Sequence, residues 1–182
     1  MVFCLTVVTA CKKSTDSIIT PPTGRNLITN SSFESESGPT IDGWTAHDST
    51  TYVFVQDAPV GGGRYSIVLQ PLWRGGLSWN SVIGRVALPL GNQRYRMSCW
   101  AKRTTERAGS INLFFGSGDV DTMTAVVSIP VMDTVWKSYS TELTWFNQTT
   151  DSAFVVLYGG WSNISYLIDS TFFDLCQLEQ ID

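Results

Sequence analysis

The stretch Ser81–Arg103, SVIGRVALPLGNQRYRMSCWAKR, indicates the fold class. It holds two runs of strand-forming residues separated by the turn-forming pair Gly91-Asn92, an arrangement that is typical of neighbouring antiparallel strands. Because side chains alternate across a strand, the second run has two faces. One face suits a core and consists of Tyr95, Met97, Cys99 and Ala101. The other face is polar apart from a tryptophan and consists of Arg96, Ser98, Trp100 and Lys102.

The same pattern extends outward from this stretch over most of the chain. Short alternating runs are broken at regular intervals by turns rich in glycine, and no helical stripe of useful length occurs. We therefore expect an all-β fold of two antiparallel sheets. The expected strands are Leu27–Phe33, Tyr52–Gln56, Tyr65–Pro71, Ser81–Leu88, Gln93–Arg103, Ser110–Phe115, Thr124–Ile129, Trp136–Trp145, Ser152–Tyr158 and Ile164–Glu179, the last broken near Ser170.

Composition and charge narrow the class of function. With 182 residues, of which 43% are hydrophobic, the chain can bury the core of one domain. Its net charge is −4 and its 12 lysines and arginines are scattered, so it offers no basic patch for nucleic acid. Aromatic residues make up 12% of the chain and include seven tryptophans. Some of these rings are expected on the surface, where exposed aromatic rings commonly bind ligands.

The first 11 residues, MVFCLTVVTAC, resemble a bacterial lipoprotein leader that ends in a lipobox cysteine. The apolar run is too short to span a bilayer, and we expect it to be removed, which leaves a lipid on Cys11; the alternative is a buried first strand. Residues 12–25 are rich in Ser, Thr and Pro, which predicts a flexible tether. Residues 26–182 would then form one domain anchored at the bacterial cell envelope, on the outer membrane or cell surface.

Five blocks of the sequence together resemble the carbohydrate-binding modules of the family 4/9 type, which are galactose-binding-like jelly rolls. The blocks occur in the family's order: NLITNSSFES followed by GW, GGGRYSIVL, SVIGRVALPLGNQRYRMSCWAKR, VWKSYSTEL and FFDLCQLEQ. The resemblance covers roughly Asn26–Asp182. It implies a two-sheet antiparallel jelly-roll β-sandwich that binds glycans on a concave sheet face or at loop tips. It also implies one structural calcium ion.

The resemblance places the metal-binding carboxylates on Glu34 and Asp174. Calcium takes oxygen ligands, and backbone carbonyls of the turn Asp57–Tyr65 would complete the set, because its three consecutive glycines allow close approach of the backbone. Asp174 lies within the apolar run FFDLC and needs a partner if it is buried. The alternative is that Glu34 is a solvated carboxylate at a strand end and Asp174 caps a turn.

A glycan site needs flat aromatic faces for the sugar ring and polar groups for its hydroxyls. Two turn-rich stretches, PLWRGGLSWN and the region around GGWSN, supply both kinds of group, whereas a second candidate face is centred on Trp100 with Arg96 beside it. The predicted ligand-binding residues are Trp73, Arg74, Trp79, Trp100, Tyr158, Trp161 and Asn163.

Other aromatic and sulfur residues are assigned to the core. Trp44 and Trp136 are expected to fill the interior, since tryptophan is usually largely buried, and Trp145 is not placed. Cys99 and Cys176 both fall in expected strands, where they form either a disulfide or a pair of buried thiols.

The sequence favours a binding protein over an enzyme. Its single histidine, His47, is followed directly by Asp48 and Ser49, but neighbours in an extended chain point to opposite faces and cannot form a catalytic triad. We expect a non-catalytic, lipid-anchored glycan-binding domain that serves a glycoside hydrolase or an uptake system. The alternative from another class is a structural or adhesive surface domain that binds a protein partner.

Overall fold

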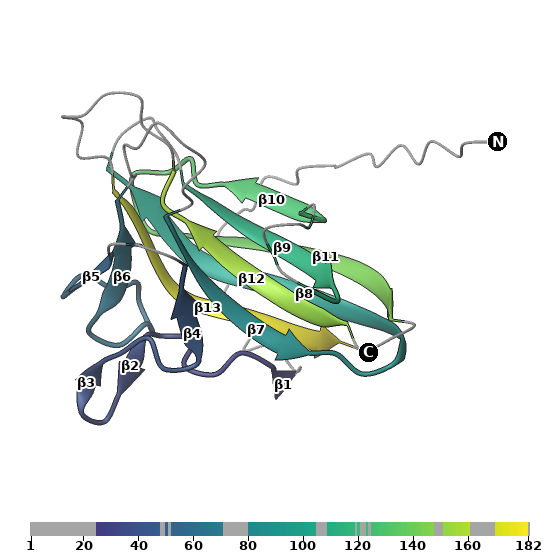
Figure 1. Ribbon diagram of the computed structural model, residues 1–182. Helices are drawn as coiled ribbons and strands as arrows, with labels where there is room; N and C mark the ends of the chain where they lie inside the picture. Colours follow the sequence, from purple (N-terminus) through teal and green to yellow (C-terminus); the bar gives the residue numbers. More distant parts are fainter. Residues whose placement is uncertain are drawn as a thin grey trace.

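The structure, a computed structural model, is a sandwich of two antiparallel sheets (Figure 1). It describes residues 25–47, 50, 52–70, 80–104, 109–118, 120, 123, 125–147, 151–160 and 170–181. No α-helix occurs among these residues, which confirms the all-β class that the alternating pattern predicts. Within the same ranges, no helix has the length and apolar character needed to cross a bilayer.

A six-stranded sheet forms one layer and carries both ends of the described domain. Its main path is β11-β8-β13-β6-β5, and β1 pairs with the free part of β13. The strands are β1 (Arg25–Asn26), β5 (Tyr52–Val55), β6 (Ser66–Leu69), β8 (Gly91–Arg103), β11 (Lys137–Asn147) and β13 (Thr171–Ile181).

A five-stranded sheet forms the other layer, in the order β10-β9-β12-β7-β4. Its strands are β4 (Trp44–Ala46), β7 (Ser81–Ala87), β9 (Ser110–Gly116), β10 (Val127–Pro130) and β12 (Ser152–Tyr158). A small hairpin, β2 (Glu34–Ser35) with β3 (Gly38–Pro39), lies outside both sheets.

The core lies between the two sheets and is built from alternate residues of their strands. The inward set predicted for β8 is confirmed, since Tyr95, Met97, Cys99 and Ala101 are each at most 1% exposed. Cys99 forms a disulfide with Cys176 of the neighbouring strand β13, which decides between the two states that the sequence left open.

The opening segment of the domain differs from the prediction. The expected strand Leu27–Phe33 is wrong: this part is irregular between β1 and β2, and Phe33 adopts a left-handed backbone with φ of 56°. That turn buries Phe33 completely against Trp44, with ring centroids 5.0 Å apart. A residue can therefore enter the core from a turn, and alternation alone does not reveal this.

The two tryptophans that are predicted to lie in the core, Trp44 and Trp136, occupy different environments. Trp44 is 6% exposed and belongs to the core, as predicted. Trp136 lies outside the core, half-buried, and its indole Nε1 donates to Asp57 Oδ1 at 3.0 Å. The prediction for Trp136 is therefore wrong. It stands just before β11, where its ring contacts the outward residues Lys102 and Phe172.

Candidate functional site

Two carboxylates from opposite ends of the domain meet at the turn between β5 and β6. Glu34 begins the β2–β3 hairpin, and its Oε1 accepts hydrogen bonds from the backbone N–H groups of Arg64, at 2.5 Å, and of Tyr65. Its own N–H donates to Asn30 Oδ1 at 2.8 Å. The Glu34 carboxylate is thus oriented by backbone N–H groups of the turn, while the Asn30 side chain holds the Glu34 backbone. Glu34 also lines a pocket that opens to solvent.

Asp174 of β13 supplies the second carboxylate, and it is fully buried. Its Oδ1 accepts from the Leu175 N–H at 2.7 Å, whereas its Oδ2 is buried without a hydrogen-bond partner. Burial raises the pKa of Asp174 to about 8, an effect that the Leu175 N–H opposes and the nearby charge of Glu34 reinforces. A buried oxygen without a partner, beside a second carboxylate, calls for a cation or a proton.

Glycines of the turn close over both carboxylates. A side-chain methyl at Gly62 would overlap Asp174 Oδ2, and one at Gly63 would overlap the Glu34 carboxylate, 2.8 Å from its Cδ. Only a chain without Cβ atoms can pass so close. The turn therefore brings backbone groups, Glu34 and Asp174 to one point.

These residues fit a hard divalent cation. The site has two carboxylates with an orphaned oxygen, backbone within reach, and access from the pocket beside Glu34. The described residues contain no group of three or more His, Cys, Asp or Glu that could hold a metal. If calcium binds at this turn, Glu34 and Asp174 would hold it with carbonyls of the turn, an all-oxygen donor set of the kind that calcium prefers.

A second candidate site lies where Tyr158 ends β12. Alternation along β12 puts Tyr158 on the outward face of the five-stranded sheet, because Val155 and Leu157 fill the core. It is half-buried, and burial raises the pKa of its hydroxyl, which stays protonated at neutral pH. Tyr158 thus offers a ring and a hydroxyl at one end of the sheet.

Three stretches of the chain meet beside Tyr158. Gly159 N donates to Asn80 O at 2.9 Å, and Asn80 Nδ2 donates to Gln70 O. A methyl at Gly159 would lie 2.9 Å from Leu69 Cβ, so the packing is tight. We call Gln70, Asn80, Tyr158 and Gly159 the Tyr158 junction.

The junction unites the flanks of the two stretches that carry most predicted ligand-binding residues. Trp73, Arg74, Trp79, Trp161 and Asn163 lie outside the described residues. Trp79 nevertheless precedes Asn80 directly, and Trp161 follows Gly159 by two residues. Since successive Cα atoms are about 3.8 Å apart, covalent connection alone ties both tryptophans to the junction.

Trp100 belongs to a different face. It lies half-buried on the outward face of the six-stranded sheet, opposite Ser138 of β11 and Asp174 of β13. Its predicted partner Arg96 is engaged by Glu142, at 2.7 Å, and by Glu179, at 3.9 Å. Trp100 and Tyr158 thus lie on opposite outer faces of the sandwich and cannot contribute to one site.

Sequence reasoning missed a cluster on the face that carries Trp100. Asp57 accepts from Lys102 Nζ at 2.5 Å and from Trp136 Nε1, and Lys102 lies over the rings of Trp136 and Phe172. Burial raises the pKa of Asp57, but the hydrogen bonds from Lys102 and Trp136 outweigh it and lower the pKa below its usual value. Only the strand register brings these residues together, since they are far apart in sequence.

Comparison with known proteins supports the fold. Neither a family model nor a curated protein sequence matches the chain. Among solved structures it resembles a family 16 carbohydrate-binding module, with a TM-score of 0.60 and 22% identity over 84% of this chain and 99% of the other. It also resembles the CBM22-1 xylan-binding domain from Paenibacillus barcinonensis Xyn10C, with a TM-score of 0.58 and 15% identity over 90% and 99%.

A third structure is a putative sugar-binding protein from Bacteroides thetaiotaomicron, with a TM-score of 0.59 and 12% identity over 86% of this chain and all of the other. Each of these structures is matched along nearly its whole length. At such identities the likeness establishes the fold. The chain therefore has the jelly-roll fold of carbohydrate-binding modules.

Proposed function

We propose that this chain is a non-catalytic glycan-binding domain whose site is built around the Tyr158 junction. The observation that carries the proposal is the junction itself, which gathers the flanks of the stretches bearing Trp73, Trp79 and Trp161 beside an outward tyrosine. Aromatic rings would stack on the apolar faces of sugar rings, while Arg74 and Asn163 would hydrogen-bond hydroxyls. The similar structures include a xylan-binding domain and a putative sugar-binding protein, which supports this class of ligand.

We further propose that one calcium ion joins Glu34, Asp174 and the turn of residues 57–65. The unpartnered Oδ2 of Asp174 and the glycine backbone packed against both carboxylates support it. The ion would fix the hairpin and β13 to the turn and would not touch the glycan. Its role would be to stabilise the fold.

The lipid anchor belongs to the same proposal. Attachment through Cys11, with residues 12–25 as a tether, would display the domain on the bacterial cell envelope. There it would hold polysaccharide near a glycoside hydrolase or an uptake system. Cys11 and the tether up to residue 24 lie outside the described residues.

The proposal is tested by applying the purified, calcium-loaded protein to an array of immobilised plant, microbial and host glycans. We expect binding to at least one glycan, and we expect Tyr158→Ala to weaken it by about tenfold or more, the effect of losing a well-placed contact at a binding site. Circular dichroism checks that both proteins are folded. A folded protein that binds no glycan would contradict the proposal and favour the protein-binding alternative.

A further inference from the structure

The strands of the five-stranded sheet carry almost no charge. Among the residues of β4, β7, β9, β10 and β12, Arg85 is the only one with a charged side chain. The six-stranded sheet is different, since its strands carry nine acidic and basic residues: Arg25, Arg94, Arg96, Lys102, Arg103, Lys137, Glu142, Asp174 and Glu179. A cation on strands that are otherwise neutral contributes strongly to the local potential beside it.

Arg85 lies on the outward face of this sheet and is exposed. It pairs in register with Phe154, and its guanidinium carbon lies 5.3 Å from the centroid of the Phe154 ring. Its Nε donates to Ser152 Oγ at 3.2 Å. The ring and the hydroxyl hold the guanidinium in place through its Cζ and Nε, and its two terminal nitrogens carry the remaining donors.

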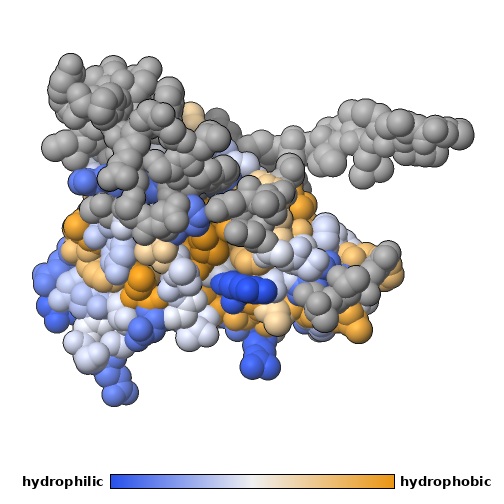
Figure 2. Space-filling view, viewed as in Figure 1, coloured by the Kyte–Doolittle hydropathy of each residue, from blue (hydrophilic) through white to orange (hydrophobic). Residues whose placement is uncertain are grey.

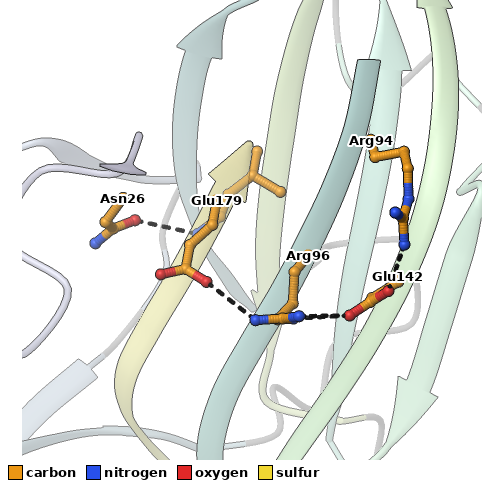
Figure 3. A network of polar contacts seen from close by, with 6 residues as sticks. Asn26, Arg94, Arg96, Glu142 and Glu179 are labelled. Atoms are coloured by element: carbon orange, nitrogen blue, oxygen red, sulfur yellow. Dashed lines mark hydrogen bonds and ion pairs between the residues drawn. The ribbon is translucent and has the colours of Figure 1, made fainter. Parts of the chain in front are cut away.

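Two arginines on the outer surface of the six-stranded sheet, Arg94 and Arg96, are neutralised by carboxylates. Figure 3 shows Arg96 between Glu142 and Glu179, with Arg94 also reaching Glu142 at 3.1 Å. No such carboxylate faces Arg85 among the residues that the structure describes. An oriented guanidinium without a counter-charge is suited to a bidentate contact with an external carboxylate or sulfate.

Arg85 shares its face with Tyr158. Four positions separate Phe154 from Tyr158 along β12, which is about 13 Å at the usual rise per residue. Phe154 and Val156 on this face are nearly fully buried in a small apolar cluster, and Ile83 of β7 beside them is half-buried. Figure 2, in which this sheet faces the viewer, shows apolar side chains on this side of the molecule with a few strongly hydrophilic ones among them. A chain of sugars that rests on Tyr158 and spans this cluster would reach Arg85.

We infer that Arg85 makes this site selective for acidic glycans, whose uronate carboxylate or sulfate ester it binds. The inference rests on the proposed glycan-binding function and adds the class of glycan. The protein as a whole carries a net charge of −4, but exposed charges farther away than about 8 Å are largely screened at physiological ionic strength. The local cation therefore decides the preference.

The test compares matched neutral and acidic polymers as probes: polygalacturonate against its methyl-esterified form, and dextran sulfate against dextran. We expect the protein to bind at least one acidic member about tenfold or more tightly than its neutral partner, the usual worth of a hydrogen bond to a charged group. The pair that shows the preference identifies the acidic group as carboxylate or sulfate. Raising the salt concentration should reduce this preference.

Three variants separate Arg85 from other causes. Arg85→Gln should lose the preference while its affinity for the neutral polymer stays within about twofold, and Arg85→Lys, which keeps the charge but not the fork of donors, should keep only part of it. Arg25→Gln, which makes the same change of charge on β1 of the other sheet, should behave like the unchanged protein. Melting temperatures check that each variant is folded.

The outcomes distinguish this inference from the proposed function. Equal binding of acidic and neutral polymers, or a preference that survives Arg85→Gln, would overturn the role of Arg85 and leave glycan binding intact. Binding of none of the polymers, nor of any glycan on the array, would overturn both.

Discussion

Removing calcium should lower the melting temperature of this protein by roughly 5–10 °C. A ligand present at about 100 times its dissociation constant stabilises the folded state by about 2.7 kcal/mol, and each kcal/mol shifts the melting temperature by about 2–4 °C in a domain of this size. Without the ion, Asp174 keeps a buried oxygen that has no partner, next to Glu34. Differential scanning fluorimetry with and without a chelator measures the effect.

The metal-free protein should also lose stability as pH rises. The pKa of Asp174 is raised to about 8 in the folded state, whereas in the unfolded chain it returns to about 3.9. Between these values the unfolded state has released a proton that the folded state retains, so the free energy of unfolding falls by about 1.4 kcal/mol per pH unit. The stability that protonated Asp174 contributes is complete below about pH 4 and is lost as pH rises through about 8. Bound calcium should remove the dependence, because it keeps the carboxylate ionised.

Matched variants test whether the ion occupies this turn. Gly62→Ala should abolish the calcium response, because its methyl would overlap Asp174 Oδ2. Gly61→Ala is the control: its methyl meets nothing within 4 Å, and only its left-handed backbone, with φ of 87°, adds strain of about 1–3 kcal/mol. Asp174→Asn should remove both the calcium response and the pH dependence. An unchanged calcium response in Gly62→Ala and Asp174→Asn would place the ion elsewhere.

Loss of Trp79 or Trp161, which lie within two residues of the junction in the sequence, should have the largest effect on binding. Trp79→Ala and Trp161→Ala should each weaken the affinity for the glycan that binds best on the array by about 30-fold or more. Truncating a tryptophan at the centre of a binding site commonly costs about 2 kcal/mol or more of binding free energy. Isothermal titration calorimetry measures the affinity.

Two other tryptophans serve as controls for that experiment. Trp136→Ala and Trp100→Ala remove half-buried rings from the opposite outer face of the sandwich. They should leave the affinity for the glycan within about twofold, although Trp136→Ala also breaks the hydrogen bond to Asp57. If Trp100→Ala caused the larger loss, the face of the six-stranded sheet would be the binding face.

The strands and their buried faces could be predicted from the sequence, because both follow from the order of residues within a single short segment. Alternation identifies which side of β8 is buried, and Ser152–Tyr158 is found with its observed bounds. Turn residues mark the breaks between strands. Glu34 and Asp174 lie together at one turn, but their pairing was inferred from the resemblance and not from the pattern of residues.

Features that depend on the pairing of distant strands could not be predicted. The sequence predicts Trp136 in the core because tryptophan side chains are usually largely buried. Its position is instead set by a hydrogen bond to Asp57, 79 residues away in sequence. Phe33 enters the core from a left-handed turn, which no alternating pattern encodes. The isolation of Arg85 becomes visible only when five separate strands are assembled into one sheet.

The location of the glycan site is tested most directly by amide NMR shifts of the calcium-loaded protein during titration with the glycan that binds best on the array. We expect the largest changes at the Tyr158 junction, at Asn80, Tyr158 and Gly159, with the amides around Trp100 unmoved. Changes confined to Trp100, Ser138 and their neighbours on the six-stranded sheet would contradict it.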